Sequence, residues 1–238
     1  MTRPPVEPVG DDRASRSSPA SGKAPGPDAL RHVRWLGGGS GAGKSTTARR
    51  LAARYGLRRY GTDESMADHV RRCPPQRCPA LHAFAAMDRD ERWVHRGPEV
   101  MLETFGWFRG EAFDLLVDDL LALPADRPVL VEGLRVLPDL VAPLLSGARQ
   151  AVWLLPTPRF RRAAFTSRGG LWDIAGRTSD PPRALANLLE RDRLFTDRLR
   201  GDVARLELGS VEVDVGLGED ELEERVAAAL GLPDAATG

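Results

Sequence analysis

The sequence predicts an α/β fold of three layers, in which a five-stranded parallel sheet is covered by helices on both faces. A glycine-rich loop at residues 38–45 joins a short, partly apolar segment to a helix-forming segment. Short apolar runs then alternate with amphipathic stretches as far as residue 230. Residues 64–128 are mostly helical in pattern, which predicts an insertion between the second and third strands.

Length and composition limit the class of protein. The 238 residues suit one domain with a sizeable insert, and 42% hydrophobic and 29% charged residues are ordinary for a soluble globular protein. The formal net charge of +0 argues against a nucleic-acid surface spread over the chain. The sequence has no apolar run of membrane-spanning length, no signal-peptide core and only two cysteines. We therefore expect a cytoplasmic protein without a membrane or nucleic-acid partner. The sequence does not indicate an oligomeric state.

The chain divides into a domain and two tails. Residues 1–29 are rich in Pro, Gly, Ser and charge, which predicts a disordered tail. We expect the domain at residues 30–233, with the helical insert at 64–128 and an arginine-rich flap at 156–181. A short tail, 234–238, follows.

Five strands and their connecting helices are expected in alternation. The strands are predicted at 32–36, 57–60, 129–133, 151–155 and 210–214. Helices are predicted at 46–55, 98–123 with breaks at Gly106 and Gly110, 137–145, 159–168, 182–200 and 219–230. The first unit reads strand, loop, helix, strand, so the first two strands are expected to be parallel neighbours joined by a right-handed crossover.

Residues 38–45 read G-x-x-x-x-G-K-S, the phosphate-binding P-loop (Walker A) pattern. A strand before it and a helix after it are the context that this motif requires, which disfavours a chance match. Glycines let several N–H groups face inward, and the helix start adds a positive dipole end. Lys44 is expected to reach the β- and γ-phosphates of ATP and Ser45 to hold Mg²⁺. The expected nucleotide-binding residues are Gly38, Gly39, Ser40, Gly41, Ala42, Gly43, Lys44, Ser45 and Thr46.

Two carboxylates follow predicted strands. Asp63 lies about twenty residues beyond Lys44, where it is placed to accept a proton from an attacking hydroxyl or to hold Mg²⁺ through water. Capping of the next helix is the alternative for Asp63. Glu132 ends an apolar strand in the position of a Walker B acid, which makes it a Mg²⁺ ligand together with Ser45, although Asp is commoner there.

Arginines follow the fourth strand. Arg161, Arg162 and Arg168 are candidates to close over ATP and neutralise charge on the transferring phosphoryl group, and we take Arg161 and Arg168 as catalytic. Arg191 is expected beside the nucleotide base, together with Arg193 and the turn 215–218. Arg135 is open to two interpretations, a ligand for a substrate anion or a surface ion pair.

Two further groups are open to more than one interpretation. His69, Cys73, Cys78 and His82 are four residues of zinc-ligand type, but their spacing matches no common zinc motif, and two free thiols beside two ordinary histidines are the alternative. The aromatic residues Trp93, Phe105, Trp107, Phe108 and Phe113 either pack the core or form a pocket wall for a substrate with a ring.

The P-loop, Asp63, Glu132-Gly133 and the arginine-rich stretch together resemble the P-loop small-molecule kinases. These include nucleoside monophosphate, shikimate and gluconate kinases and chloramphenicol phosphotransferase-like enzymes. Residues 60–64 and 153–158 are similar to uncharacterised P-loop ATP-binding proteins of actinobacterial type. The resemblance covers residues 31–231 and implies an ATP- and Mg²⁺-dependent transferase acting on a small hydroxylated or phosphorylated metabolite, with Asp63 facing that acceptor.

The chain departs from that group at two places. Glu132-Gly133-Leu134-Arg135 only approximates the D-G-F-P-R of adenylate kinases, because the arginine comes one place early, and this argues against a nucleoside monophosphate as acceptor. Residues 156–181 are too short for a full lid domain. The alternative function is a nucleotide-binding switch without metabolite phosphorylation. A GTPase would need the guanine-reading N-K-x-D, which the sequence lacks.

Overall fold

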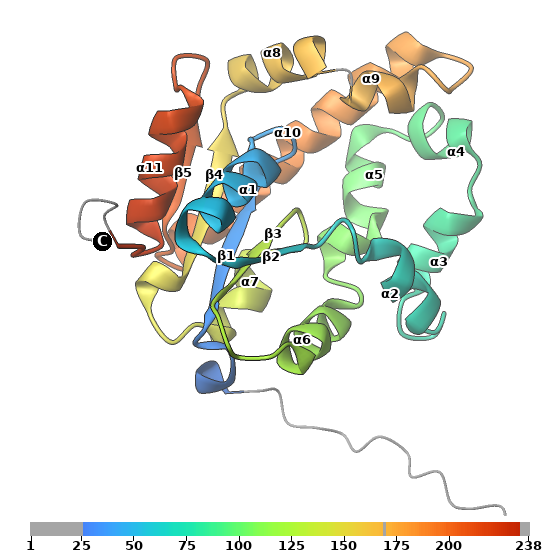
Figure 1. The fold of residues 1–238 in the computed structure, drawn as a ribbon. Helices are drawn as coiled ribbons and strands as arrows, with labels where there is room; N and C mark the ends of the chain where they lie inside the picture. The colour runs from blue at the N-terminus through green and yellow to red at the C-terminus, as the bar shows by residue number, and fades with distance from the viewer. Residues whose placement is uncertain (1–25, 169, 234–238) are drawn as a thin grey trace, which may run out of the picture.

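A computed structural model describes residues 26–168 and 170–233 of the chain, with the side chains of residues 165–172 left out of the description. Its centre is an all-parallel sheet with the strand order β2-β3-β1-β4-β5 (Figure 1). The strands are β1 Val33–Gly38, β2 Arg58–Gly61, β3 Val129–Glu132, β4 Ala151–Pro156 and β5 Ser210–Val213. The five strand positions predicted from the sequence are confirmed.

The expected pairing of the first two strands is wrong. β3 lies between β1 and β2, with Leu36 and Gly61 in register with Glu132 from either side. All four residues of β3 are buried, whereas β2 is half-buried over most of its length. Because a strand that is buried along its whole length is most stable with neighbours on both sides, β3 takes the inner position and β2 the edge.

Helices cover both faces of the sheet, which therefore lies between two helical layers. On one face, α1 (Lys44–Tyr55) and α11 (Glu219–Ala229) pack against side chains such as Val152 and Leu154. On the other, α6 (Phe113–Ala122), α7 (Pro138–Val141) and α10 (Pro181–Arg205) pack against Trp153 and Leu155. The alternation along β4 is the period of two that a strand imposes on its side chains.

The insert between β2 and β3 is helical, as the sequence predicts. It contains α2 Met66–Arg72, α3 Pro79–Ala86, α4 Arg89–Trp93, α5 Pro98–Thr104, a 3-10 turn Gly106–Arg109 and α6. Gly110 has φ of 78° and ends the 3-10 turn, so the expected break in the long helical stretch is confirmed. Figure 1 shows α2 to α5 grouped to one side of the sheet.

Several connections differ from the sequence prediction. The helix expected at 137–145 is only α7 followed by a 3-10 turn, Ala142–Leu144, because Pro143 lacks the N–H that a longer helix needs. α10 runs further than expected, to Arg205. The flap consists of α8 Pro158–Arg168 and α9 Gly170–Ala175. Ala175 is buried with Val94 and Leu188, so the end of the flap is packed against the insert and α10.

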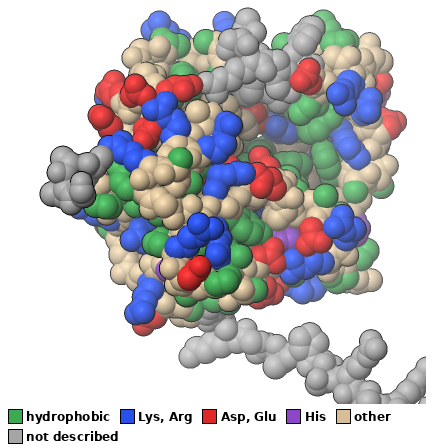
Figure 2. Space-filling model, in the orientation of Figure 1, with side chains coloured by type: hydrophobic (Ala, Val, Ile, Leu, Met, Phe, Trp, Pro, Cys, Tyr) green, Lys and Arg blue, Asp and Glu red, His purple; other side chains and the backbone are tan. Residues whose placement is uncertain are grey.

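The start of the described chain is part of the core. A 3-10 turn, Pro27–Leu30, precedes β1, and Leu30 is fully buried. The first three residues of this turn, 27–29, were assigned by the sequence to the disordered tail, so the ordered chain begins slightly earlier than predicted. Residues 1–25 and 234–238 lie outside the described residues. Across those that are described, no helix is long and apolar enough to cross a bilayer. On the face shown in Figure 2, positive and negative side chains are intermixed.

Candidate functional site

The glycine-rich loop leads from the end of β1 into α1, with geometry that demands glycine. Gly38, Gly41 and Gly43 have φ of 132°, 74° and 86°. A Cβ on Gly38 would lie 2.2 Å from the Leu154 carbonyl oxygen, and one on Gly39 would lie 2.5 Å from Thr196 Oγ1. No side chain caps the start of α1. The loop therefore presents the positive end of a helix without a side-chain cap.

Lys44, the first residue of α1, is buried within this loop. Its Nζ donates a 2.8 Å hydrogen bond to the Gly39 carbonyl oxygen. Burial lowers the pKa of Lys44, while the charges of Asp63, Glu132 and Asp192 act to raise it. Three carboxylates on three different elements therefore lie close enough to act electrostatically on one ammonium group.

Glu132, at the end of β3, connects the loop helix with the edge strand. Its Oε2 accepts a 3.0 Å hydrogen bond from Ser45 Oγ, and its Oε1 accepts a 2.9 Å bond from Arg59 Nη1. The side chain is almost fully buried. Ser45 and Glu132, predicted as a pair of metal ligands, are thus brought together. No group of three or more His, Cys, Asp or Glu in the described part of the chain is arranged to hold a metal ion.

Asp63 shares a pocket with the glycine-rich loop. The pocket has a volume of about 240 Å³ and is lined by Ser40, Gly41, Ala42, Gly43, Lys44, Ser45, Thr46, Asp63 and Leu134. The residue that caps α2 is Ser65, and no side chain makes a capping hydrogen bond there. The helix-cap alternative for Asp63 is therefore wrong, and its carboxylate belongs to the pocket.

A second, smaller pocket adjoins the first, and Gly43 and Thr46 line both. Its volume is about 110 Å³, and its wall is largely apolar, with Phe160 from α8, Val213 from β5 and Leu217 from the following turn. Leu217 belongs to the turn 215–218, which the sequence predicts to lie near the nucleotide base. Phe160 was not among the predicted site residues, because a single aromatic residue among arginines does not form a recognisable sequence motif.

Arg161, expected on the flap as a catalytic residue, is buried beneath the glycine-rich loop. Its Nη2 donates a 2.6 Å hydrogen bond to Thr196 Oγ1, the atom that faces Gly39. Burial lowers the pKa of Arg161, and its Nε has no hydrogen-bond partner. Arg161 is therefore placed to support the loop through Thr196. The side chain of Arg168 lies outside the description, and Arg162 is exposed.

Arg191, expected beside a nucleotide base, lies away from both pockets at the glycine-rich loop. Its guanidinium is buried within 5.4–5.5 Å of the ring centres of Trp93, Phe105 and Phe108, and it lines neither pocket. Arg191 Nε and Nη2 both donate to Asp192 Oδ1, at 2.9 and 2.6 Å. The helical turn directs residue 191 toward the insert, an orientation that residue type alone does not reveal. Arg193 pairs with Glu190 and Asp197 on the same helix.

Arg135 is neither a surface ion pair nor an anion ligand. It is buried, its Nη2 donates to the Ala112 carbonyl oxygen at 2.7 Å, and its guanidinium lies 4.3 Å from the centre of the Trp107 ring. Its Nη1 donates to His69 Nδ1 at 2.7 Å, so the other ring nitrogen of His69 carries the proton and donates to Asp119 Oδ2 at 2.8 Å. Burial lowers the pKa of Arg135 to about 10.

The expected alternatives for the cysteines and histidines are both replaced by a different arrangement. Cys73 and Cys78 form a disulfide, with Cα atoms 6.0 Å apart, so neither is a free thiol or a thiolate ligand. His69 is held by Asp119 and Arg135, and His82 Nε2 lies 2.8 Å from the Cys73 carbonyl oxygen. Of the aromatic residues, Trp107 and Phe108 are buried in the core, whereas Trp93 and Phe105 are only partly covered.

The chain matches no model of a protein family and none of the curated proteins.

Proposed function

We propose that this protein is an ATP- and Mg²⁺-dependent kinase that transfers a phosphoryl group to a small hydroxylated or phosphorylated metabolite. The observation that carries the proposal is the 3.0 Å contact between Ser45 Oγ and Glu132 Oε2 at the start of the loop helix. Lys44 and Asp63 line the same pocket as Ser45. Phosphoryl transfer requires little beyond such positioning of charges around the phosphates.

The donor set suits magnesium. Hydroxyl and carboxylate oxygens are the ligands that Mg²⁺ prefers, with water and phosphate oxygens completing its shell. Ser45 and Glu132 supply one of each, and Asp63 lines the pocket beside Ser45. Mg²⁺ bound there would offset the charge of the β- and γ-phosphates.

Each side chain has a role in the proposed transfer. Lys44 exchanges its hydrogen bond to the Gly39 carbonyl for the phosphate oxygens. Asp63 accepts the proton of the acceptor hydroxyl as that oxygen bonds to the γ-phosphorus and the bond from phosphorus to the bridging oxygen breaks. The smaller pocket, with Phe160 and Leu217 in its wall, would hold the adenine ring. Arg161 is a positioning residue that acts through Thr196.

The first test is Lys44→Ala, with Arg225→Ala as a matched loss of one positive charge on the exposed face of α11. ADP release is measured with ATP and Mg²⁺, with and without a pool of small metabolites. We expect acceptor-dependent ADP release in the wild type and in Arg225→Ala, and none above background in Lys44→Ala, whose circular dichroism stays unchanged. Turnover by Lys44→Ala at the wild-type rate contradicts the scheme.

The alternative function, a nucleotide-binding switch, gives a different result in the same assay. A switch binds ATP or hydrolyses it at a rate that the metabolite pool does not change. Asp63→Asn separates the two further. For a kinase we expect the variant to bind ATP normally but to lose about 10²–10⁴-fold in kcat, the usual contribution of a general base.

A further inference from the structure

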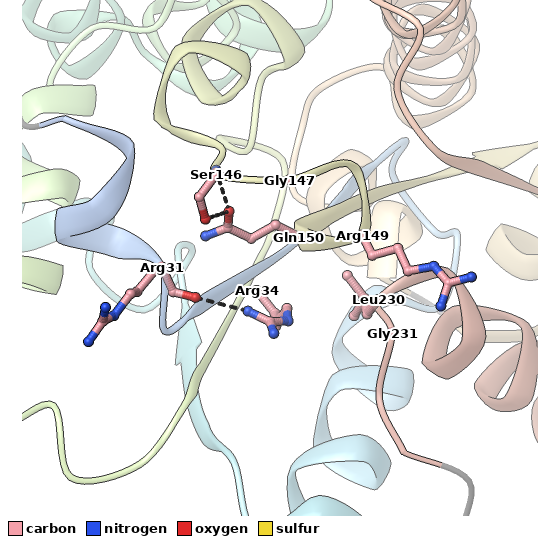
Figure 3. A pocket seen from close by; sticks show the side chains of 8 residues that line it. All are labelled: Arg31, Arg34, Ser146, Gly147, Arg149, Gln150, Leu230 and Gly231. Carbon is pink, nitrogen blue, oxygen red and sulfur yellow. Dashed lines mark hydrogen bonds between the residues drawn. The ribbon is translucent and has the colours of Figure 1, made fainter.

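A basic pocket, separate from the two at the glycine-rich loop, lies where β1 and β4 begin, at the opposite end of these strands from the loop. Its volume is about 250 Å³, and its wall includes Arg31, Arg34, Ser146, Arg149, Gln150 and Gly231 (Figure 3). Arg34 lies near the start of β1 and Gly38 at its end. At about 3.3 Å per strand residue, the two ends of this stretch are about 13 Å apart. The two pockets have no lining residue in common.

The three arginines of this pocket lack carboxylate partners. Many arginines of this chain are neutralised, as Arg50 and Arg72 are, but Arg31, Arg34 and Arg149 form no ion pair with any carboxylate that the structure describes. Arg34 Nη1 donates to the carbonyl oxygens of Arg31 and Val33, at 3.1 and 3.4 Å. Its Nε is buried without a partner. The pocket therefore holds three positive charges with no internal counter-charge.

The floor of the pocket is fixed by a buried amide. Gln150 Oε1 accepts from the N–H and Oγ of Ser146, at 2.7 and 2.9 Å, and Gln150 Nε2 donates to the Leu30 carbonyl oxygen at 2.7 Å. Gly231 has φ of 61°, and a Cβ there would lie 3.2 Å from Arg149 Cδ. These hydrogen bonds connect residues 146–150 to Leu30 at the pocket floor. Gly231, from a third segment, leaves room for the Arg149 side chain.

A purely structural role explains only part of this arrangement. Arg149 lies beside Leu230 and Gly231 at the end of α11, where a positive charge complements the helix dipole. Arg31 and Arg34 belong to the segment that leads into β1, and Figure 3 shows Arg34 between the other two, whose side chains extend to opposite sides of it. Capping of α11 does not account for them.

We infer that this pocket binds a phosphate group, either as free phosphate or as part of a small phosphorylated molecule. Arginine forks match the oxygens of a phosphate and form the strong, charge-assisted hydrogen bonds that this anion requires. The volume of about 250 Å³ is below the usual range for pockets of drug-sized ligands, so the site suits a compact anion. This inference does not depend on the proposed kinase activity.

The test is a titration of the Lys44→Ala protein with sodium phosphate. The ionic strength is kept constant with sodium chloride. Lys44→Ala is used so that phosphate binding at the glycine-rich loop contributes little to the signal. Calorimetry gives the dissociation constant, and thermal unfolding gives the accompanying rise in Tm. In the same background, Arg149→Ala and Arg34→Lys are compared with the control Arg127→Ala. Arg127 is exposed near the start of β3 and does not line the pocket.

We expect Arg149→Ala and Arg34→Lys to weaken phosphate binding by about tenfold or more, which is the loss of one hydrogen bond to a charged group. Arg127→Ala is expected to bind like its parent. Tighter binding of glycerol 3-phosphate would identify a phosphorylated molecule as the ligand, and equal or weaker binding would identify free phosphate. The inference is overturned if phosphate does not bind, or if all three variants bind it equally.

Discussion

Glu132 is the residue on which the candidate metal site depends. Aspartate is the commoner residue at the end of such a strand, but the longer side chain here reaches two partners from two elements. One oxygen accepts from Ser45 and the other from Arg59, which also pairs with the exposed Glu64. The length of Glu132 is therefore compatible with a role beside Ser45.

Replacing Glu132 by glutamine should raise the Mg²⁺ concentration required for half-maximal ADP release by about tenfold or more, because a neutral amide is a poor ligand for Mg²⁺. Nucleotide binding without Mg²⁺ should change little. Glu64→Gln is the matched control, since it removes the other carboxylate that bonds Arg59. If both substitutions raised the required Mg²⁺ concentration equally, the role of Glu132 would be to hold Arg59 and not to bind the metal.

Gly39 and Thr196 are in such close contact that they should be energetically coupled. Gly39→Ala would place a methyl group 2.5 Å from Thr196 Oγ1 and is expected to destabilise the protein. Thr196→Ala removes that oxygen and with it the clash. The double variant should therefore lose less free energy of unfolding than the two single variants lose together, by about 0.5–3 kcal/mol. Denaturant unfolding of all four proteins measures this coupling. Strict additivity would show that the loop does not rest on Thr196.

At the scale of elements, β1, β3 and β4 could be predicted from the sequence because each is a short, mainly apolar run, whereas β2 and β5 were placed by the turn residues that bound them and by the alternation of strands with helices. The order of the strands could not be predicted, since it depends on which of β2 and β3 has more apolar surface to bury on both sides. Within the site, the loop motif placed Lys44 and Ser45, and strand ends placed Asp63 and Glu132. The inward turn of Arg135, the direction of Arg191 and the contact of Thr196 with Gly39 arise from packing between distant segments, which local patterns do not encode.

α2 and α3 are joined by a covalent element that the sequence alone left open. The disulfide between Cys73 and Cys78 closes a short loop, with a sequence separation of 5. Restricting the unfolded chain with a loop of this size stabilises the fold by about 2 kcal/mol. The change Cys73→Ala with Cys78→Ala should lower the free energy of unfolding by that amount. Wild-type protein in reductant should match the variant, and the variant should not respond to reductant.

At the scale of the whole molecule, His69 should make the stability depend on pH. Burial lowers its pKa, although its hydrogen bond to Asp119 opposes this shift. Below about pH 6.5, His69 is protonated in the unfolded chain but remains neutral in the folded protein. The free energy of unfolding therefore falls as the pH drops below that value. The decrease is at most about 1.4 kcal/mol per pH unit.

The measurement is urea unfolding between pH 7.5 and pH 5. His69→Gln should be less stable at pH 7.5 and should show a smaller slope than wild type. His95→Gln, which alters an exposed histidine, should keep the wild-type slope. Matching slopes for wild type and His69→Gln would mean that the buried imidazole takes up its proton without loss of the fold.

The long helix α10 contacts both the insert and the glycine-rich loop. Arg191 lies among aromatic rings of the insert, and Thr196, five residues later on the same helix, lies against the glycine-rich loop. The two residues lie about 7.5 Å apart along the axis of one continuous hydrogen-bonded helix, so a displacement of the helix at one contact would alter the other. If a molecule bound at the insert displaced the helix, it would change the affinity of the loop for a ligand, and by thermodynamic linkage a ligand of the loop would change the affinity at the insert by the same factor.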